Sequence, residues 1–120
     1  MSETTIAWTS TPRPDGTSAP GYTFNPWSGC SKLSAGCVNC YAAALPPGMR
    51  RGAVWGPDLP RVSASESYWR QPFTWDRKAR AEGVRRKVFA GSTCDIGEDR
   101  RDLDDHRARL FATIALTPGL

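Results

Sequence analysis

The sequence predicts an α/β fold with parallel strands, of which the chain holds only the beginning. An extended segment over residues 22–25 is followed by a cysteine loop and a helix, then by an irregular connection, a second strand and a last helix. This alternation is typical of parallel β/α architectures. Parallel strands need several neighbours and cover on both faces, which two strands and two helices do not supply. The missing strands come either from another chain or from a continuation of this one, and we favour the second.

The first half of the chain is divided at the cysteine loop. Residues 1–24 are expected to form an N-terminal arm and loop, and residues 25–120 the N-terminal fragment of a cysteine-motif β/α domain. Residues 4–8 have the composition of a short strand, and residues 9–21 are rich in Pro, Ser, Gly and Thr, as loops are. Asn25 precedes a proline, which favours an extended backbone there. The run 38–45 contains good helix formers and ends at two prolines.

The second half contains the clearest strand. Residues 65–70 are expected to form a helical turn that ends before Pro72, and Thr74 is expected to cap a separate helix over 75–82, which Gly83 ends. The segment 85–92 is predicted as a strand because residues 88–90 are all apolar. The last helix begins at Asp102 or Asp104 and ends at residues 117–119. Its apolar face is predicted to comprise Leu103, Leu110, Phe111, Ile114 and Ala115.

An incomplete sheet of this kind has consequences for stability. It leaves a strand edge and the apolar faces of the helices uncovered. We therefore expect the 120-residue chain to be only marginally stable when it is alone.

The composition argues against a membrane protein and favours a cytoplasmic one. Of the 120 residues 39% are hydrophobic, no apolar run is long enough to cross a bilayer, and the N-terminus lacks the pattern of a secretory signal. Thiols stay reduced in the cytoplasm, so clustered cysteines there are more often metal ligands or catalytic groups than disulfides.

Nucleic acid is a weakly supported partner. The net charge is +4, and basic residues gather at 77–87 and at 100–101, but acidic residues interrupt both groups. A solvated helix face is the more ordinary interpretation. The five tryptophans could stack on bases, yet such residues more commonly pack irregular loops onto a sheet.

The strongest chemical signal is a group of three cysteines, Cys30, Cys37 and Cys40, within eleven residues. Cys37 and Cys40 have the C-x-x-C spacing, which places two sulfurs within reach of one metal centre, and Cys30 adds a third. Three thiolates suit an iron–sulfur cluster with one iron open, or a zinc ion that needs a fourth ligand. In the zinc alternative Cys94 or His106 supplies that ligand, and the protein is a non-catalytic module with nucleic acid as a candidate partner. Spacing alone favours the cluster.

Two more residues are candidates for cofactor binding. Asp95 follows the strand predicted over 85–92, and ligands of open α/β sheets lie at the carboxyl ends of strands. Its carboxylate is expected either to contact a ribose or substrate, or to cap a turn. Tyr41 follows the last cysteine of the motif and, with Trp27, is expected to shield a bound cluster from water.

Several segments together resemble the N-terminal part of a phage-associated family of unknown function with a three-cysteine motif similar to that of radical S-adenosylmethionine (SAM) enzymes. These segments are 5–9, 25–42, 55–58, 68–77, 88–92, Asp95 and 107–120. The resemblance implies a radical-SAM-like partial (β/α) barrel, truncated here after the second β/α unit. It also implies a 4Fe-4S cluster on Cys30, Cys37 and Cys40, and SAM at the open iron.

The same resemblance implies a radical-SAM-like enzyme with an unknown substrate, of which this fragment alone is expected to be inactive. Two features depart from the radical SAM pattern. Six residues separate the first two cysteines instead of three, and Asn39 stands where an aromatic residue is common. In the family that the chain resembles, a further strand follows the last helix, which agrees with a truncated sheet.

Overall fold

The computed structural model describes residues 3–120 and is built around one small sheet. Its strands are ordered β1 (Glu3–Thr4), β4 (Gly21–Phe24) and β7 (Val88–Ala90). β1 runs antiparallel to β4, whereas β4 and β7 are parallel, with Tyr22 opposite Val88 and Phe24 opposite Ala90. The two predicted strands are therefore present and run in the same direction. Residues 3–120 form no barrel, and the larger barrel stays a prediction.

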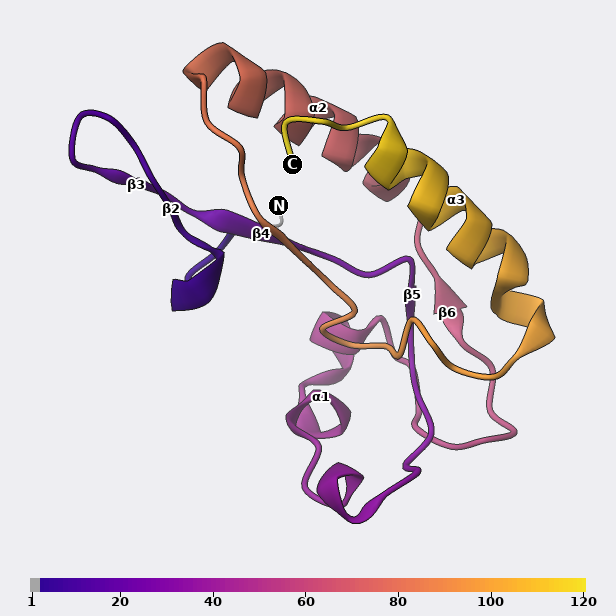
Figure 1. The fold of residues 1–120 in the computed structure, drawn as a ribbon. Helices are drawn as coiled ribbons and strands as arrows, with labels where there is room; N and C mark the ends of the chain where they lie inside the picture. Colours follow the sequence, from indigo (N-terminus) through magenta and orange to yellow (C-terminus); the bar gives the residue numbers. More distant parts are fainter. Residues whose placement is uncertain (1–2) are drawn as a thin grey trace.

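The core lies on one face of β4. Tyr22 and Phe24 are two residues apart and so point to the same side of the strand. There they meet aromatic residues of α2 (Glu66–Glu82): the Tyr22 ring stacks on Trp75 at 4.3 Å, and Phe24 meets Trp69 edge-on at 5.1 Å. Leu110 of α3 (Asp104–Ala115) completes the cluster. Figure 1 accordingly shows α2 and α3 on one side of β4.

The helix α2 is longer than we expected. Ser65 caps its N-terminus by accepting a hydrogen bond from the Tyr68 N–H at 3.2 Å, and Gly83 ends it in the left-handed region at φ 71°. The predicted break at Pro72 and the cap at Thr74 are wrong, because the helix runs through both. Pro72 removes one backbone donor. The aromatic residues on either side of it, Trp69 and Trp75, are both buried, and their packing outweighs the local preference.

The last helix begins at Asp104, which is one of the two predicted starts. A 3-10 turn over Arg101–Leu103 precedes it. Its predicted apolar face is only partly correct. Leu103 and Leu110 are buried, but Phe111, Ile114 and Ala115 are exposed. Thr113 and Thr117 are buried instead, and each hydroxyl donates to a backbone carbonyl one turn earlier at 2.8 Å. This satisfies the hydroxyls and lets two polar residues pack inside.

The other elements are short. β2 (Thr11–Pro12) and β3 (Ser18–Ala19) form a hairpin where we expected a loop, and a 3-10 turn over Ala7–Thr9 replaces part of the strand expected over 4–8. β5 (Trp27–Ser28) pairs with β6 (Val62–Ser63). The helix expected over 38–45 shrinks to α1 (Tyr41–Ala44), flanked by 3-10 turns at Ala35–Cys37 and Pro47–Arg50.

Two strands of the expected N-terminal arm, β1 and β4, lie in the same sheet as β7. The boundary at residue 24 stays a prediction. Within residues 3–120, no helix has both the length and the apolar character needed to cross a membrane.

Candidate functional site

The cysteine loop begins where the parallel strands end. After β4 and β5, the Gly29 N–H donates to the Thr93 carbonyl at 3.0 Å, and Gly29 forms a parallel bridge with Cys94. Gly29 has φ 113°, a conformation that a side chain would strain. Two chain segments thus leave the carboxyl edge of the sheet side by side, and each carries a cysteine, Cys30 or Cys94, next to this bridge.

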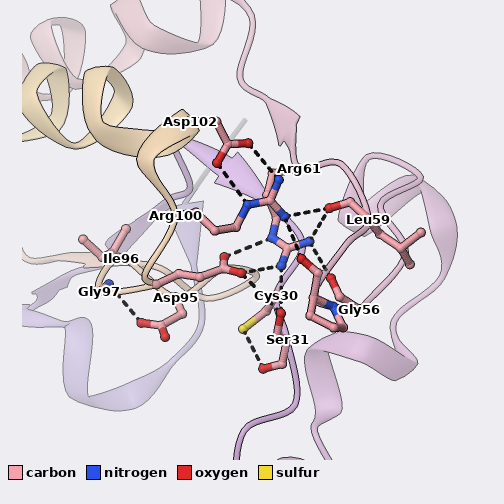
Figure 2. A network of polar contacts seen from close by, with 12 residues as sticks. Cys30, Ser31, Gly56, Leu59, Arg61, Asp95, Ile96, Gly97, Arg100 and Asp102 are labelled. Carbon is pink, nitrogen blue, oxygen red and sulfur yellow. Dashed lines mark hydrogen bonds and ion pairs between the residues drawn. The ribbon is translucent and has the colours of Figure 1, made fainter.

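Cys30 is held by a network of polar contacts (Figure 2). Its thiol donates to the Ser31 carbonyl at 3.4 Å, and the Ser31 hydroxyl contacts both Glu98, at 3.4 Å, and Arg61, at 3.0 Å. Burial is the main reason that the pKa of the Cys30 thiol is raised. This end of the loop is therefore fixed, and its cysteine is predominantly a neutral thiol in the absence of a metal.

The centre of this network is a buried ion pair between Arg61 and Glu98, whose side chains are 2% and 6% exposed. The Arg61 Nε donates to Glu98 at 3.0 Å, and its Nη1 donates to the carbonyls of Gly56 and Leu59 at 3.0 and 2.8 Å. Breaking a buried pair by removing one partner strands a charge away from water. The pair thus ties the connection after α1 and the segment after β7 to the start of the cysteine loop.

The other end of the loop is held mainly by local contacts, such as the bonds from the Cys37 N–H to the Ser34 carbonyl and from the Cys40 N–H to the Cys37 carbonyl. Cys37 and Cys40 are half-buried. The Ser34 hydroxyl lies 3.5 Å from the Cys37 sulfur, and this contact lowers the pKa of Cys37. A thiol with a lowered pKa is more often in the thiolate form, which is the form that binds metals. Cys37 is therefore the cysteine of the motif best prepared chemically to bind an ion.

Three free thiols are chemically suitable metal ligands, but in this structure they do not lie close enough together to share an ion. None of the four cysteines forms a disulfide. However, no three His, Cys, Asp or Glu residues among 3–120 lie close enough together to hold a metal ion. The predicted set of Cys30, Cys37 and Cys40 shares one loop without converging. Binding an ion would require the Cys37 and Cys40 end of the loop to move toward Cys30.

Cys94, the candidate fourth ligand for zinc, lies beside the loop and is half-buried, like the other cysteines. Burial raises the pKa of Cys94 to about 12, and its sulfur lies 3.8 Å from the Asn25 side-chain oxygen. It is therefore a neutral thiol at physiological pH. The other candidate, His106, contacts the Ser63 hydroxyl at 3.2 Å through its Nε2 and packs 6.2 Å from the Trp27 ring.

The two other predicted cofactor-binding residues have structural contacts of their own. An Asp95 carboxylate oxygen accepts from the Gly97 N–H at 2.9 Å, so the turn cap is one role that it plays. A contact between Asp95 and a ribose or substrate stays a prediction. The Tyr41 hydroxyl donates to the Ser92 carbonyl at 3.0 Å, which joins α1 to the exit of β7. Its side chain is 60% exposed, while Trp27 is fully buried.

Sequence reasoning missed Arg61 and Glu98. They are 37 residues apart in irregular segments, so no helical or strand spacing relates them. The one available signal was the presence of charged residues in segments that flank the cysteine loop and the strand exit.

The basic segment at 77–87 is less available than its composition suggests. Arg86 is buried: it donates to the Pro20 carbonyl, pairs with Glu3 at 3.0 Å and lies over the Tyr22 ring at 4.3 Å. Of the tryptophans, Trp27, Trp69 and Trp75 are buried, in agreement with a packing role. The other basic residues of this segment are exposed, and contact with nucleic acid stays a prediction.

A family model described as "Protein of unknown function (DUF5131)" matches residues 3–120. The chain belongs to this family. The match covers nearly all of the sequence, so the resemblance to a family of unknown function is confirmed. No curated protein and no solved structure is significantly similar to the chain.

Proposed function

We propose that this DUF5131 chain is the cysteine-bearing part of a phage-associated iron–sulfur protein, in which Cys30, Cys37 and Cys40 hold a 4Fe-4S cluster. The observation that carries the proposal is the placement of three free cysteines on one loop at the carboxyl edge of the parallel pair β4 and β7. This edge is where α/β proteins bind their ligands. Cys30, Cys37 and Cys40 would hold this cluster, which in its reduced state would supply the electron for reductive cleavage of SAM, the chemistry of radical SAM enzymes.

The chain's own residues contribute anchoring and charge. Cys30 is fixed through Ser31 to the buried Arg61–Glu98 pair, so its sulfur offers a constant first ligand. Cys37 has a lowered pKa and lies on the less restrained end, so it can approach as a thiolate. Metal binding commonly drives such local ordering, because the free energy of ligation stabilises the closed arrangement. We expect the loop to close in this way.

The test is anaerobic reconstitution of the whole chain with iron and sulfide, followed by metal analysis and absorption spectroscopy. We expect a brown protein with about four irons per chain, and Cys37→Ala to lose them. Cys94→Ala is the matched control, because Cys94 has a strongly raised pKa and is not a proposed cluster ligand. Wild type that takes up no iron would contradict the proposal, as would iron that remains in Cys37→Ala.

A zinc-stabilised, non-catalytic module is the alternative function, and the bridge between Gly29 and Cys94 is the observation that favours it. This bridge places a fourth cysteine next to the first residue of the motif. Zinc would have to displace the proton of Cys94, whose pKa is near 12. Stoichiometric zinc without iron, lost on Cys94→Ala as well as on Cys37→Ala, would establish this alternative and exclude the cluster.

A further inference from the structure

A cavity of about 520 Å³ lies beside the cysteine loop. Its walls include Thr23 and Asn25 from the end of β4, Ser92 from the exit of β7, Tyr41 from α1, and Arg51. The cavity thus lies at the carboxyl ends of the two parallel strands. Open α/β sheets commonly bind small molecules at this position, and the volume suits one.

Arg51 is the charged group in this wall whose hydrogen-bonding capacity is largely unused. Its Nη2 donates to the Asn25 carbonyl at 2.9 Å, and its guanidinium lies 4.6 Å above the Tyr68 ring. The other terminal nitrogen, Nη1, is buried and has no hydrogen-bond partner within the part of the chain that the structure describes. A buried cationic donor without an acceptor is unfavourable, and a ligand that accepts from it removes that cost.

The backbone at Arg51 is also unusual. Arg51 has φ 54°, and within residues 3–120 no other residue except glycine has a positive φ. Its N–H donates to the Pro47 turn, so the turn holds it in this conformation. Strained residues of this kind are frequent at binding sites, where the surrounding structure holds a side chain in place.

The charges around the cavity leave Arg51 uncompensated. Glu3 also lines the cavity, but its carboxylate pairs with Arg86. The preceding residue, Arg50, uses its guanidinium on the carbonyls of Leu45 and Ala53 at 2.8 and 2.6 Å. Among residues 3–120, Arg51 is therefore the single cation in the cavity wall, and its Nη1 can still donate a hydrogen bond.

We propose that this cavity binds the oxyanion of a small molecule, a carboxylate or a phosphate, through the guanidinium of Arg51. The planar guanidinium matches the geometry of both groups. The inference does not depend on the cysteines holding a cluster, because none of the residues that support it is a cysteine.

The test is an NMR titration of the whole metal-free chain with inorganic phosphate and, separately, sodium acetate, at ionic strength held constant with sodium chloride. We expect saturable shifts at the backbone amides of Gly48, Ser92 and Thr93, which line the cavity. Whichever anion binds more tightly identifies the chemical class. In Arg51→Met we expect affinity to fall about tenfold or more, because a charge-assisted hydrogen bond is lost.

The matched control is Arg77→Met, which removes the same charge from an exposed position of α2. It is expected to leave the affinity unchanged. If Arg51→Met does not fold, Arg51→Lys retains the cation without the fork of donors and is expected to bind more weakly than wild type. Three results would each overturn the proposal. They are shifts spread over exposed basic residues, an absence of saturation, and an affinity of the Arg51 variants equal to that of the wild type.

Discussion

The two ends of the cysteine loop differ in how firmly the fold holds them. Cys30 lies next to the strand bridge and is anchored by the buried Arg61–Glu98 pair, whereas Cys37 and Cys40 are half-buried in short 3-10 and helical turns. The anchored end has a thiol with a raised pKa, and the other end contains one with a lowered pKa. The fold thus fixes one thiol in space and raises the thiolate fraction of another, which is the arrangement that the proposed closure of the loop would use.

The largest expected effect is at the anchored end. Replacing Glu98 with Ala leaves the Arg61 guanidinium buried without its partner carboxylate. We expect the free energy of unfolding to fall by about 3–5 kcal/mol, measured by urea denaturation. Asp102→Ala, which removes an exposed carboxylate paired with Arg100, is the control and should cost far less. Equal losses in the two variants would show that the buried pair does not anchor this end.

A smaller effect concerns Cys94, which lies beside the anchored end. Its pKa of about 12 in the folded chain is above the value of an unperturbed thiol, so only the unfolded chain releases this proton between about pH 9 and 12. Its contribution to stability is therefore complete below pH 8.5 or so and is lost as the pH rises, at about 1.4 kcal/mol per pH unit.

Stability measured from pH 8 to 10.5 should therefore fall more steeply in wild type than in Cys94→Ala. The variant lacks the titrating group but keeps the other ionisable residues, so the difference between the two slopes isolates the thiol. Parallel slopes would mean that Cys94 is accessible to water.

The smallest expected effect is at the less restrained end. Ser34→Ala removes the hydroxyl that lowers the pKa of Cys37. Alkylation of Cys37 by iodoacetamide at pH 7.5 should slow a few-fold, because less thiolate is present. Ser10→Ala serves as the comparison, because Ser10 is half-buried, its hydroxyl donates to the Ala7 carbonyl, and it lies far from the loop in sequence. In wild type Cys37 should react before Cys30 and Cys94, and a reversed order would contradict the contrast between the two ends.

The strands were predictable from the sequence because their signals are local. The proline after Asn25 predicted an extended segment at 22–25, and the apolar run at 88–90 predicted β7. Their parallel direction followed from the alternation of elements. The helix α2 was not predictable as one piece, since a local rule at Pro72 opposes the burial of Trp69 and Trp75. Tertiary packing decided that conflict, and no local pattern records it.

The sequence predicted which cysteines belong to the candidate site, but not how the residues of the site are arranged in space. Cysteine spacing identified Cys30, Cys37 and Cys40 directly. The Arg61–Glu98 pair and the unpartnered nitrogen of Arg51 depend on contacts between distant segments. Spacing says nothing of how far apart the sulfurs lie in the fold, and the expected convergence does not appear in residues 3–120.

The stacked rings of Tyr22 and Trp75, whose planes differ by only 5°, give the molecule an optical reporter of its own. Rigidly packed aromatic side chains produce near-ultraviolet circular dichroism, and this signal disappears when tertiary packing is lost. The pair belongs to β4 and α2 and contains no cysteine. Its signal can therefore be followed while the thiols are mutated or alkylated, and it would separate a change in the loop from collapse of the whole chain.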